Sequence, residues 1–339
     1  MKRAACFGEI MMRLNPIGYQ RFLQAKEFEA SFAGGEANAA VSLANYGVKS
    51  SFITKVPAHE IGQCAVNELR RFGVDTSKIV RGGDRLGVYF VEKGASQRAS
   101  KVIYDRAGSA ISEAQPSDFN WPAILEHEDW LHFTGITPAL SDSAAQITLE
   151  ALQCAKELGI YVSCDLNFRK KLWNSEKAGR VMGNLMQYVN LCIANEEDAA
   201  DVFGIHAEGS DLTKGVLNRE GYISVAKQLK GLFGFDLVAI TLRESLSASI
   251  NNWSGMLFDG QAYFAANYPI HIVDRVGGGD SFGGALIYAL LEKYGKQRAI
   301  DFAVAASCLK HTIEHDFNMA SIQEIEALAG GNASGRVQR

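Results

Sequence analysis

Three consecutive glycines followed by an aspartate, at residues 277–280, form the first stretch of the sequence whose residue types could do chemistry. Apolar residues recur at helical spacing directly after them, at Phe282, Leu286 and Leu290, so the glycines stand where a helix is expected to begin. N–H groups in the first turn of a helix have no intrahelical partner and, with the helix dipole, attract an anion. The glycine turn therefore predicts an anion-binding site.

The carboxylate of Asp280 would repel a bound phosphate, so its presence beside an anion site needs a chemical explanation. The role that fits is general base: Asp280 accepts the proton of an attacking hydroxyl, while N–H groups of Gly277, Gly278 and Gly279 stabilise a transferring phosphoryl group. The alternative is a tight turn in which Asp280 only caps the helix. These four residues alone do not decide between the two interpretations.

A second glycine pair lies in AGGEANAA, residues 33–40, where another helix is expected to begin. There the backbone can approach a sugar closely and Asn38 can bond its hydroxyls; Asn38 bonded to the backbone is the alternative. The sequence has no G-x-x-x-x-G-K-[ST] pattern for a P-loop, and no G-x-G-x-x-G after the first expected strand. Both absences weaken the case for those two nucleotide-binding classes.

The elements that must position these residues alternate between apolar runs and amphipathic helical stretches, a pattern typical of a parallel sheet covered on both faces. Strands are expected over residues 5–14, 50–56, 130–135, 161–167, 191–195 and 237–242. Helices are expected over residues 36–47, 61–73, 143–159 and 222–234, and after the glycine turn.

Two segments break this alternation, residues 15–33 and about 86–107, where short strands follow one another without a helix. The second segment predicts a hairpin around a polar Gly and Ser loop. If Tyr89 lies opposite Tyr104, strand alternation places both phenols and Arg106 on one face. That face is either part of a binding site or an exposed edge whose tyrosines cover a core.

Composition restricts the classes of partner. The 339 residues are 47% hydrophobic and 21% charged with a net charge of −4, which argues against a general nucleic-acid binder. Six cysteines without a C-x-x-C pair are expected to be buried, reduced thiols. The N-terminus lacks a signal-peptide core, and no apolar stretch approaches a membrane span. We expect a cytoplasmic protein with small-molecule partners, no nucleic acid and no membrane.

Several segments resemble a known family. AGGEANAAVSLANYG and DRVGGGDSFGGAL are similar to the two signatures of the ribokinase-like, or PfkB-type, carbohydrate kinases, and together they bracket most of the chain. YDRAGSA, DLNFRKKLW, TLRESLSAS and KHTIEHDFN resemble segments of the 2-keto-3-deoxygluconate kinases within that family. The resemblance implies an α/β, three-layer ribokinase-like fold with a mostly parallel central sheet flanked by helices and a small β-sheet lid. The implied main domain is 1–14, 34–85 and 108–328, the lid is 15–33 and 86–107, and 329–339 is a flexible tail.

The resemblance also implies roles for individual residues. Asp280 matches the catalytic base of the family and Gly277 to Gly279 match its anion hole, while Gly34 and Asn38 match substrate-binding positions. Four further positions match those around the substrate of the keto-deoxy-acid kinases: Tyr89, Tyr104, Arg106 and Arg169. The two guanidinium groups suit the carboxylate of a sugar acid; pairing of either with an aspartate such as Asp105 or Asp165 is the alternative.

For ATP and Mg²⁺ the implied residues lie in three segments. ANEED resembles the N-x-x-E motif that organises the magnesium and phosphate shell, with Asn195 and Glu196 as participants and Asp198 in place of the usual glutamate. Thr241 and Arg243 lie in the nucleotide loop, where many relatives carry glycine in place of the arginine. Asn167 and the turn residues Gly277 and Gly279 complete the expected nucleotide contacts.

The expected activity is ATP-dependent phosphorylation of 2-keto-3-deoxy-D-gluconate at its C6 hydroxyl. A kinase of the galactonate epimer, a fructokinase and a sugar-binding regulator without turnover are the alternatives. A homo-oligomer, such as a dimer through the lid, is expected from the exposed lid strands. HTIEH, residues 311–315, also fits the H-x-x-E-H pattern of zinc peptidases, but a chance match is favoured, and His315 stands where the subgroup carries glycine.

Overall fold

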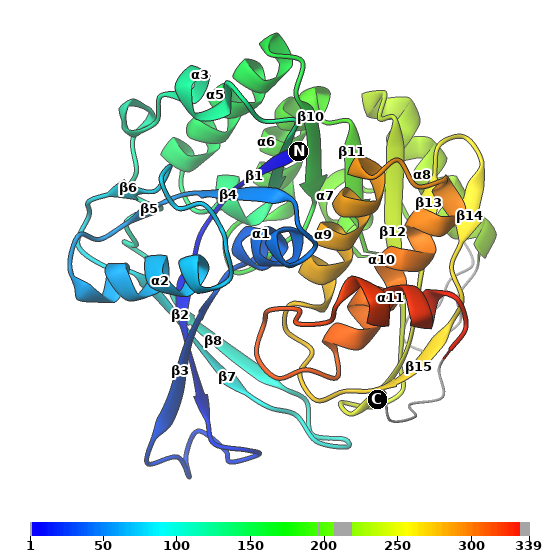
Figure 1. Cartoon of the computed structure of the whole chain (residues 1–339), viewed down its shortest axis with the longest axis horizontal. Helices are drawn as coiled ribbons and strands as arrows, with labels where there is room; N and C mark the ends of the chain where they lie inside the picture. Colours follow the sequence, from blue (N-terminus) through cyan, green and yellow to red (C-terminus); the bar gives the residue numbers. More distant parts are fainter. Residues whose placement is uncertain (1, 196, 207–218, 333–339) are drawn as a thin grey trace.

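The computed structural model describes residues 2–195, 197–206 and 219–332, in which strands and helices alternate (Figure 1). Within these residues the central sheet has nine strands in the order β14-β13-β12-β11-β10-β9-β1-β4, with β15 also paired to β13. The strands are β1 (Arg3–Phe7), β4 (Lys49–Ile53), β9 (Trp130–Thr134), β10 (Tyr161–Asp165), β11 (Leu191–Ala194), β12 (Leu237–Ser245), β13 (Ile250–Phe258), β14 (Ala262–Phe264) and β15 (Tyr268–His271).

Pairing is parallel from β4 through β12 and antiparallel at β13, β14 and β15. Parallel strands need a crossover between them, and helices supply it. The mostly parallel sheet expected from the sequence is therefore confirmed. The carboxyl ends of β10, β11 and β12 meet at one edge, where open α/β sheets bind their ligands.

Helices cover both faces of the sheet. One core packs α1 (Gly35–Asn45), α2 (Glu60–Arg71), α9 (Gly278–Leu291), α10 (Lys296–Lys310) and α11 (Ile322–Ala329) against alternate strand residues such as Ala4 and Cys6. The other core packs α3 (Trp121–Leu125), α5 (Asp142–Glu157), α6 (Ser175–Leu185), α7 (Asp198–Phe203) and α8 (Arg219–Phe233) against Ala5 and Phe7. Because successive strand residues point to opposite faces, β1 contributes to both cores. The three-layer architecture is confirmed.

A separate four-stranded sheet projects from the main body in the order β3-β2-β7-β8 (Figure 1). Its strands are β2 (Met11–Pro16), β3 (Phe28–Ala33), β7 (Gly87–Glu92) and β8 (Lys101–Asp105); we call this sheet the lid. Tyr89 pairs with Tyr104 across the antiparallel β7 and β8, so the predicted register of this hairpin is confirmed. A short pair, β5 (Lys55–Val56) and β6 (Val80–Arg81), lies outside both sheets.

The single strand predicted over residues 5–14 is wrong, because the chain changes sheets within it. β1 ends at Phe7 in the central sheet, and β2 begins at Met11 in the lid. Gly8 lies at the break, where a Cβ atom would overlap the carboxyl group of Glu36. The predicted strand over residues 50–56 is likewise interrupted, between β4 and β5. Only one to three residues separate the strands at these two breaks, so periodicity alone could not locate them.

Two other expectations concern the surface and the chain end. Five cysteines are buried as expected, but Cys64 is exposed on the outer face of α2, which corrects the expectation for that residue. Of the tail predicted over 329–339, residues 333–339 lie outside the described residues. Within the described part of the chain, none of the helices combines the length and hydropathy needed to cross a bilayer.

Candidate functional site

Asp280 lies in the first turn of α9, at the carboxyl edge of the central sheet, where it lines cavities together with the lid residues Tyr89 and Tyr104. The N-cap of α9 is Gly277, which has a left-handed φ of +86°, and Asp280 follows three residues later inside the helix. The cap interpretation of Asp280 is therefore wrong. Its carboxylate instead faces α1, where Asn38 Nδ2 donates a 2.6 Å hydrogen bond to Asp280 Oδ2.

Burial raises the pKa of Asp280 to about 6, against the opposing effect of the hydrogen bond from Asn38. The negative charge of nearby Asp316 raises the pKa further, and the positive charge of Arg169 lowers it. A carboxyl group with this pKa is mostly ionised at pH 7 and still basic enough to take up a proton, as a general base must.

The glycine turn requires glycine for two different reasons. Gly277 has positive φ, and its Cβ atom would overlap the carbonyl oxygen of Asp316; at Gly278 a Cβ atom would overlap the ring of His311. Gly279 is exposed and has open space where its Cβ would lie. The turn is therefore packed closely on one side and open on the other, where its N–H groups can meet an anion.

Two cavities meet at Asp280. The larger, of about 340 Å³, lies between the lid and the carboxyl ends of β10, β11 and β12. Its wall contains most of the residues expected to contact the nucleotide: Asn167, Asn195, Asp198, Thr241, Arg243, Gly277 and Gly279. Asn167 is buried and holds a positive φ of 40°, so its backbone turns sharply at the end of β10.

The smaller cavity, of about 80 Å³, lies between the lid and the first turn of α1. All six expected substrate residues line it: Gly34, Asn38, Tyr89, Tyr104, Arg106 and Arg169. Asp280, Tyr104, Asn167 and Arg169 belong to both cavities. A phosphoryl donor in the larger cavity and an acceptor in the smaller one would thus meet beside Asp280.

The lid supplies two tyrosines with different environments. Their rings stack with centroids 6.0 Å apart, and the guanidinium of Arg106 lies 5.3 Å from the centre of the Tyr104 ring. Tyr89 is buried and donates its hydroxyl to Asp316 Oδ2 at 2.8 Å, whereas 38% of Tyr104 is exposed. Tyr104 is therefore the phenol that remains accessible to a ligand.

The two arginines also differ. Arg106 is buried and forms an ion pair with Glu9, to which Ser109 also donates at 2.7 Å. The partner expected as an alternative, Asp105, instead pairs with Arg85. Arg169 donates to the Phe168 carbonyl at 3.1 Å, and among the described residues it has no carboxylate within ion-pair distance. Of these two arginines, Arg169 is thus the one that is open to an anionic ligand.

Three aspartates give the larger cavity a negative wall. Burial raises the pKa of Asp165, Asp198 and Asp280, and neighbouring carboxylates raise that of Asp165 further. Asp198 accepts N–H bonds from Phe168 and Asn195 at 2.9 and 3.1 Å, which fix its orientation. Glu196 lies outside the described residues, and within them no three acidic, His or Cys side chains form a metal-binding group.

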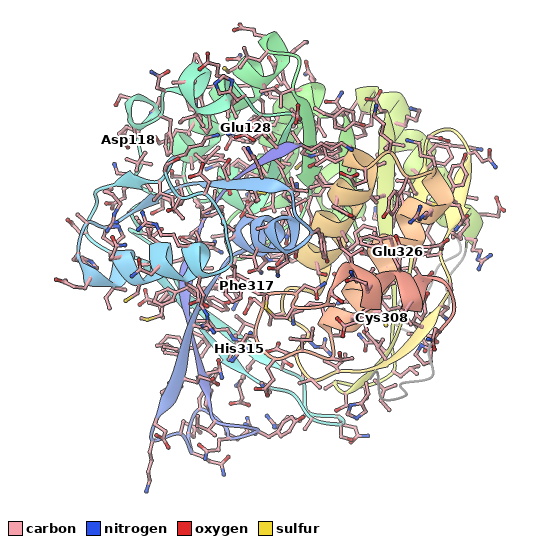
Figure 2. The ribbon with its side chains drawn as sticks, viewed as in Figure 1. Asp118, Glu128, Cys308, His315, Phe317 and Glu326 are labelled. Carbon is pink, nitrogen blue, oxygen red and sulfur yellow. The ribbon has the colours of Figure 1, made fainter. Side chains whose placement is uncertain are left out.

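The two histidines of HTIEH do not share a helical face, because α10 ends at Lys310. His311 Nδ1 lies 2.7 Å from the Ser307 carbonyl, and His315 Nε2 lies 3.2 Å from Glu29 of the lid. Figure 2 shows His315 at the junction between the main body and the lid. His315 has a φ of +63°, a conformation that favours glycine.

Sequence reasoning missed two carboxylates of this site, Glu9 and Asp316. Both line the smaller cavity and bind residues of the lid. Glu9 interrupts an apolar run in the sequence, and such a charge is a signal of a buried partner. Asp316 carried no comparable signal, because it lies in a polar segment after α10 where a charged side chain is not unusual.

A mostly parallel α/β sheet, a β lid and a carboxylate beside a glycine turn together define a kinase-like architecture. The profile of the pfkB family carbohydrate kinases matches residues 1–314. The crystal structure of a 2-dehydro-3-deoxygluconokinase from Thermotoga maritima superimposes with a TM-score of 0.95 at 51% identity, covering 98% of this chain and 100% of that one.

Two further relatives are similar in sequence. A 2-dehydro-3-deoxygalactonokinase from Haloferax volcanii is 32% identical over 330 residues, covering 96% of both chains. A 2-dehydro-3-deoxygluconokinase from Thermoproteus tenax is 30% identical over 306 residues, covering 89% of this chain and 86% of that protein. The chain belongs to the pfkB family of carbohydrate kinases, as its two signature segments predict. It is a sugar kinase.

Proposed function

We propose that this kinase uses ATP to phosphorylate the C6 hydroxyl of 2-keto-3-deoxy-D-gluconate. The observation that carries the proposal is the position of Arg169, which lies where the two cavities meet and has no carboxylate partner among the described residues. A sugar acid supplies that partner, whereas a neutral ketose leaves the guanidinium without one.

In the proposed mechanism the sugar acid occupies the smaller cavity. Its carboxylate binds Arg169, and Arg106, whose Nε and Nη2 donate to Glu9, contributes its remaining Nη1 group to the clamp. Tyr104 bonds to the sugar hydroxyls, and Gly34, which must be glycine because a Cβ atom would overlap the Glu9 carbonyl, lines the cavity beside the sugar. The far hydroxyl then reaches Asp280, which Asn38 holds in place through the 2.6 Å hydrogen bond.

Asp280 accepts the proton of the C6 hydroxyl as the oxygen attacks the γ-phosphorus of ATP. The bond from that phosphorus to the β,γ-bridging oxygen breaks, and ADP leaves with the bridging oxygen. The N–H groups of Gly277, Gly278 and Gly279 stabilise the phosphoryl group during transfer. Closure of the lid over the sugar excludes water, which would otherwise hydrolyse ATP.

The nucleotide would lie in the larger cavity, with Thr241, Arg243, Asn167 and Asn195 beside its phosphates. Magnesium prefers oxygen ligands and keeps several waters, so the carboxylates of this wall suit an ion carried by the triphosphate. Asp198 would hold it through water molecules, since both its oxygens already accept N–H bonds. Bound magnesium would neutralise charge on the triphosphate.

The galactonate epimer is a second candidate substrate, because one of the similar relatives is a 2-dehydro-3-deoxygalactonokinase. The two sugar acids share the carboxylate and the terminal hydroxyl and differ at one carbon. Arg169 and Asp280 would bind and activate both alike. Discrimination would therefore depend on the hydroxyl contacts of the smaller cavity, such as those of Tyr104.

The test measures ADP release with 2-keto-3-deoxygluconate, its galactonate epimer and fructose, in the wild type and in Arg169→Met. Turnover of the sugar acids alone, with a large rise in their KM in the variant, supports the proposal. Arg180→Met, which changes a helix-surface arginine of α6, is the matched control. Faster turnover of fructose would contradict the substrate, and no ADP release with any of the three sugars would indicate a sugar-binding regulator without turnover.

A further inference from the structure

Arg13 is the largest of the fully buried side chains outside the proposed chemistry, and it connects the lid to the glycine turn. It lies on β2 of the lid with none of its surface exposed. Its Nη1 donates to Asp316 Oδ1 at 2.6 Å and its Nη2 to Asp274 Oδ2 at 2.5 Å. One guanidinium group thus joins two carboxylates that lie 42 positions apart in the chain.

Each of these carboxylates also holds the glycine turn. Asp274 Oδ1 accepts from the backbone N–H of Val276 at 3.1 Å, directly before Gly277. The carbonyl oxygen of Asp316 packs against Gly277 so closely that a Cβ atom there would overlap it. Arg13 therefore determines the position of both segments that support the turn.

The cluster is electrically balanced. Lys310, also fully buried, donates to the carbonyl oxygens of Asp274 and Ile313 at 3.2 and 3.3 Å. Arg13 and Lys310 supply two positive charges, and Asp274 and Asp316 supply two negative ones. Buried charges are stable only when paired, so the members of this cluster must keep their geometry together.

The lid contributes a second contact to the same cluster. Tyr89 on β7 donates its hydroxyl to Asp316 Oδ2, the oxygen that Arg13 leaves free. Two lid strands thus bind one carboxylate, and the ring of Tyr89 stacks on Tyr104 at the smaller cavity. Buried contacts therefore connect the smaller cavity to the glycine turn, from Tyr89 to Asp316 and from Asp316 through Arg13 to Asp274.

We propose that Arg13 is a positioning residue that fixes the glycine turn to the lid, so that sugar bound under the lid orders the N–H groups that receive the phosphoryl group. The inference rests on the proposed function. Only a guanidinium can reach both carboxylates at once, because its donors form a planar fork. A lysine at this position would keep the charge and bind only one of them.

The test compares Arg13→Lys with Arg21→Lys, a matched change of a lid arginine whose ion pair with Glu92 stays inside the lid. We expect Arg13→Lys to lower kcat about 10- to 100-fold while the KM values for sugar and ATP change less than about threefold. Arg21→Lys should leave all three constants unchanged. A purely structural role would lower the amount of folded enzyme without this split between kcat and KM.

Hydrogen exchange gives a readout that does not depend on activity. With 2-keto-3-deoxygluconate alone, exchange should slow both in the lid, residues 87–105, and in the turn, residues 274–284, in the wild type. In Arg13→Lys the lid should still be protected and the turn should not. Asp274→Asn, which keeps the shape of the side chain, repeats the test should Arg13→Lys not fold.

Turn protection and kcat that stay at wild-type values in a folded Arg13→Lys or Asp274→Asn variant would overturn the inference. No ADP release from the wild type or from Arg21→Lys would instead contradict the proposed function. The two failures are distinguishable because the second is seen in proteins with an intact cluster.

Discussion

The side chain of Asn38 donates a hydrogen bond to Asp280 across 242 positions of the chain, and this bond joins the first turns of α1 and α9. The other end of the same amide accepts from the N–H of Gly34 at 3.3 Å. An amide nitrogen can only donate, so Asp280 is the acceptor, and the contact favours its ionised form. Asn38 thus keeps the carboxylate of Asp280 ionised and correctly oriented.

Asp280→Asn should lower turnover by about 10²- to 10⁴-fold, the range for loss of a general base, because an amide cannot accept the proton of the hydroxyl. The dissociation constant for ATP, measured by calorimetry, should change less than about threefold, since the side chain does not bind the nucleotide. Asp142→Asn, in the exposed first turn of α5, is the matched control. Wild-type turnover in the Asp280 variant would remove this residue as the base.

Activity should fall as the pH decreases through about 6, because Asp280 must be ionised and its pKa lies there. In Asn38→Ala the hydrogen bond that lowers this pKa is lost, so the acidic limb of kcat/KM should move to higher pH. A pH profile measures the shift, with Asn67→Ala on the exposed face of α2 as control. An acidic limb that stays in place would show that another group controls it.

The raised pKa of Asp280 also predicts a stability difference. A carboxyl group whose pKa is higher in the folded state stabilises the protein below its unfolded pKa, and this contribution is lost as the pH rises through about 6. In the Asp280→Asn variant the side chain at position 280 is an amide, which does not titrate in this range. Its stability relative to the wild type should therefore increase between pH 4 and 7, by on the order of 2 kcal/mol. Urea unfolding of both proteins at each pH measures the difference, and a difference that is independent of pH would contradict the prediction.

The sequence alone predicted the architecture well because the relevant signals are local. Strand and helix periodicity located the parallel sheet, and a glycine run before an apolar helix located the turn at the start of α9. The pairing of Tyr89 with Tyr104 followed from one hairpin. Each of these features depends on residues close together in the chain.

The features that could not be predicted from the sequence depend on contacts between segments that are far apart in the chain. At the switch from β1 to β2, Gly8 packs against Glu36 in α1, and the pairing of Arg106 with Glu9 spans 97 positions. Arg13 looked like an ordinary strand residue, although it binds carboxylates near the other end of the chain. A guanidinium has many possible carboxylates, and only the fold selects among them.

The glycines of the turn should respond differently to alanine. Gly277→Ala is strained by the positive φ and by overlap with Asp316, so both thermal stability and turnover should decrease. Gly279→Ala meets open space and should fold with an unchanged melting temperature, while a methyl group beside the phosphoryl path should lower kcat. Thermal melts and ADP release from the two variants, beside Gly295→Ala at the N-cap of α10, test this contrast. A lowered melting temperature in Gly279→Ala would contradict it.

Removing one or the other arginine of the proposed carboxylate clamp should affect stability differently. Arg106→Met leaves the buried carboxylate of Glu9 without its ion-pair partner, which typically costs about 3–5 kcal/mol, so this variant should unfold at a lower temperature. Arg169→Met removes a half-buried cation that has no carboxylate partner among the described residues, so its melting temperature should stay close to that of the wild type. The double variant Arg106→Met with Glu9→Gln removes both charges and should recover most of the lost stability. Because Arg169→Met stays folded, a rise in the KM for the sugar acid in this variant reports on substrate binding alone. Equal destabilisation by Arg106→Met and Arg169→Met would show that Arg169 is engaged in the folded protein and is not free for a ligand.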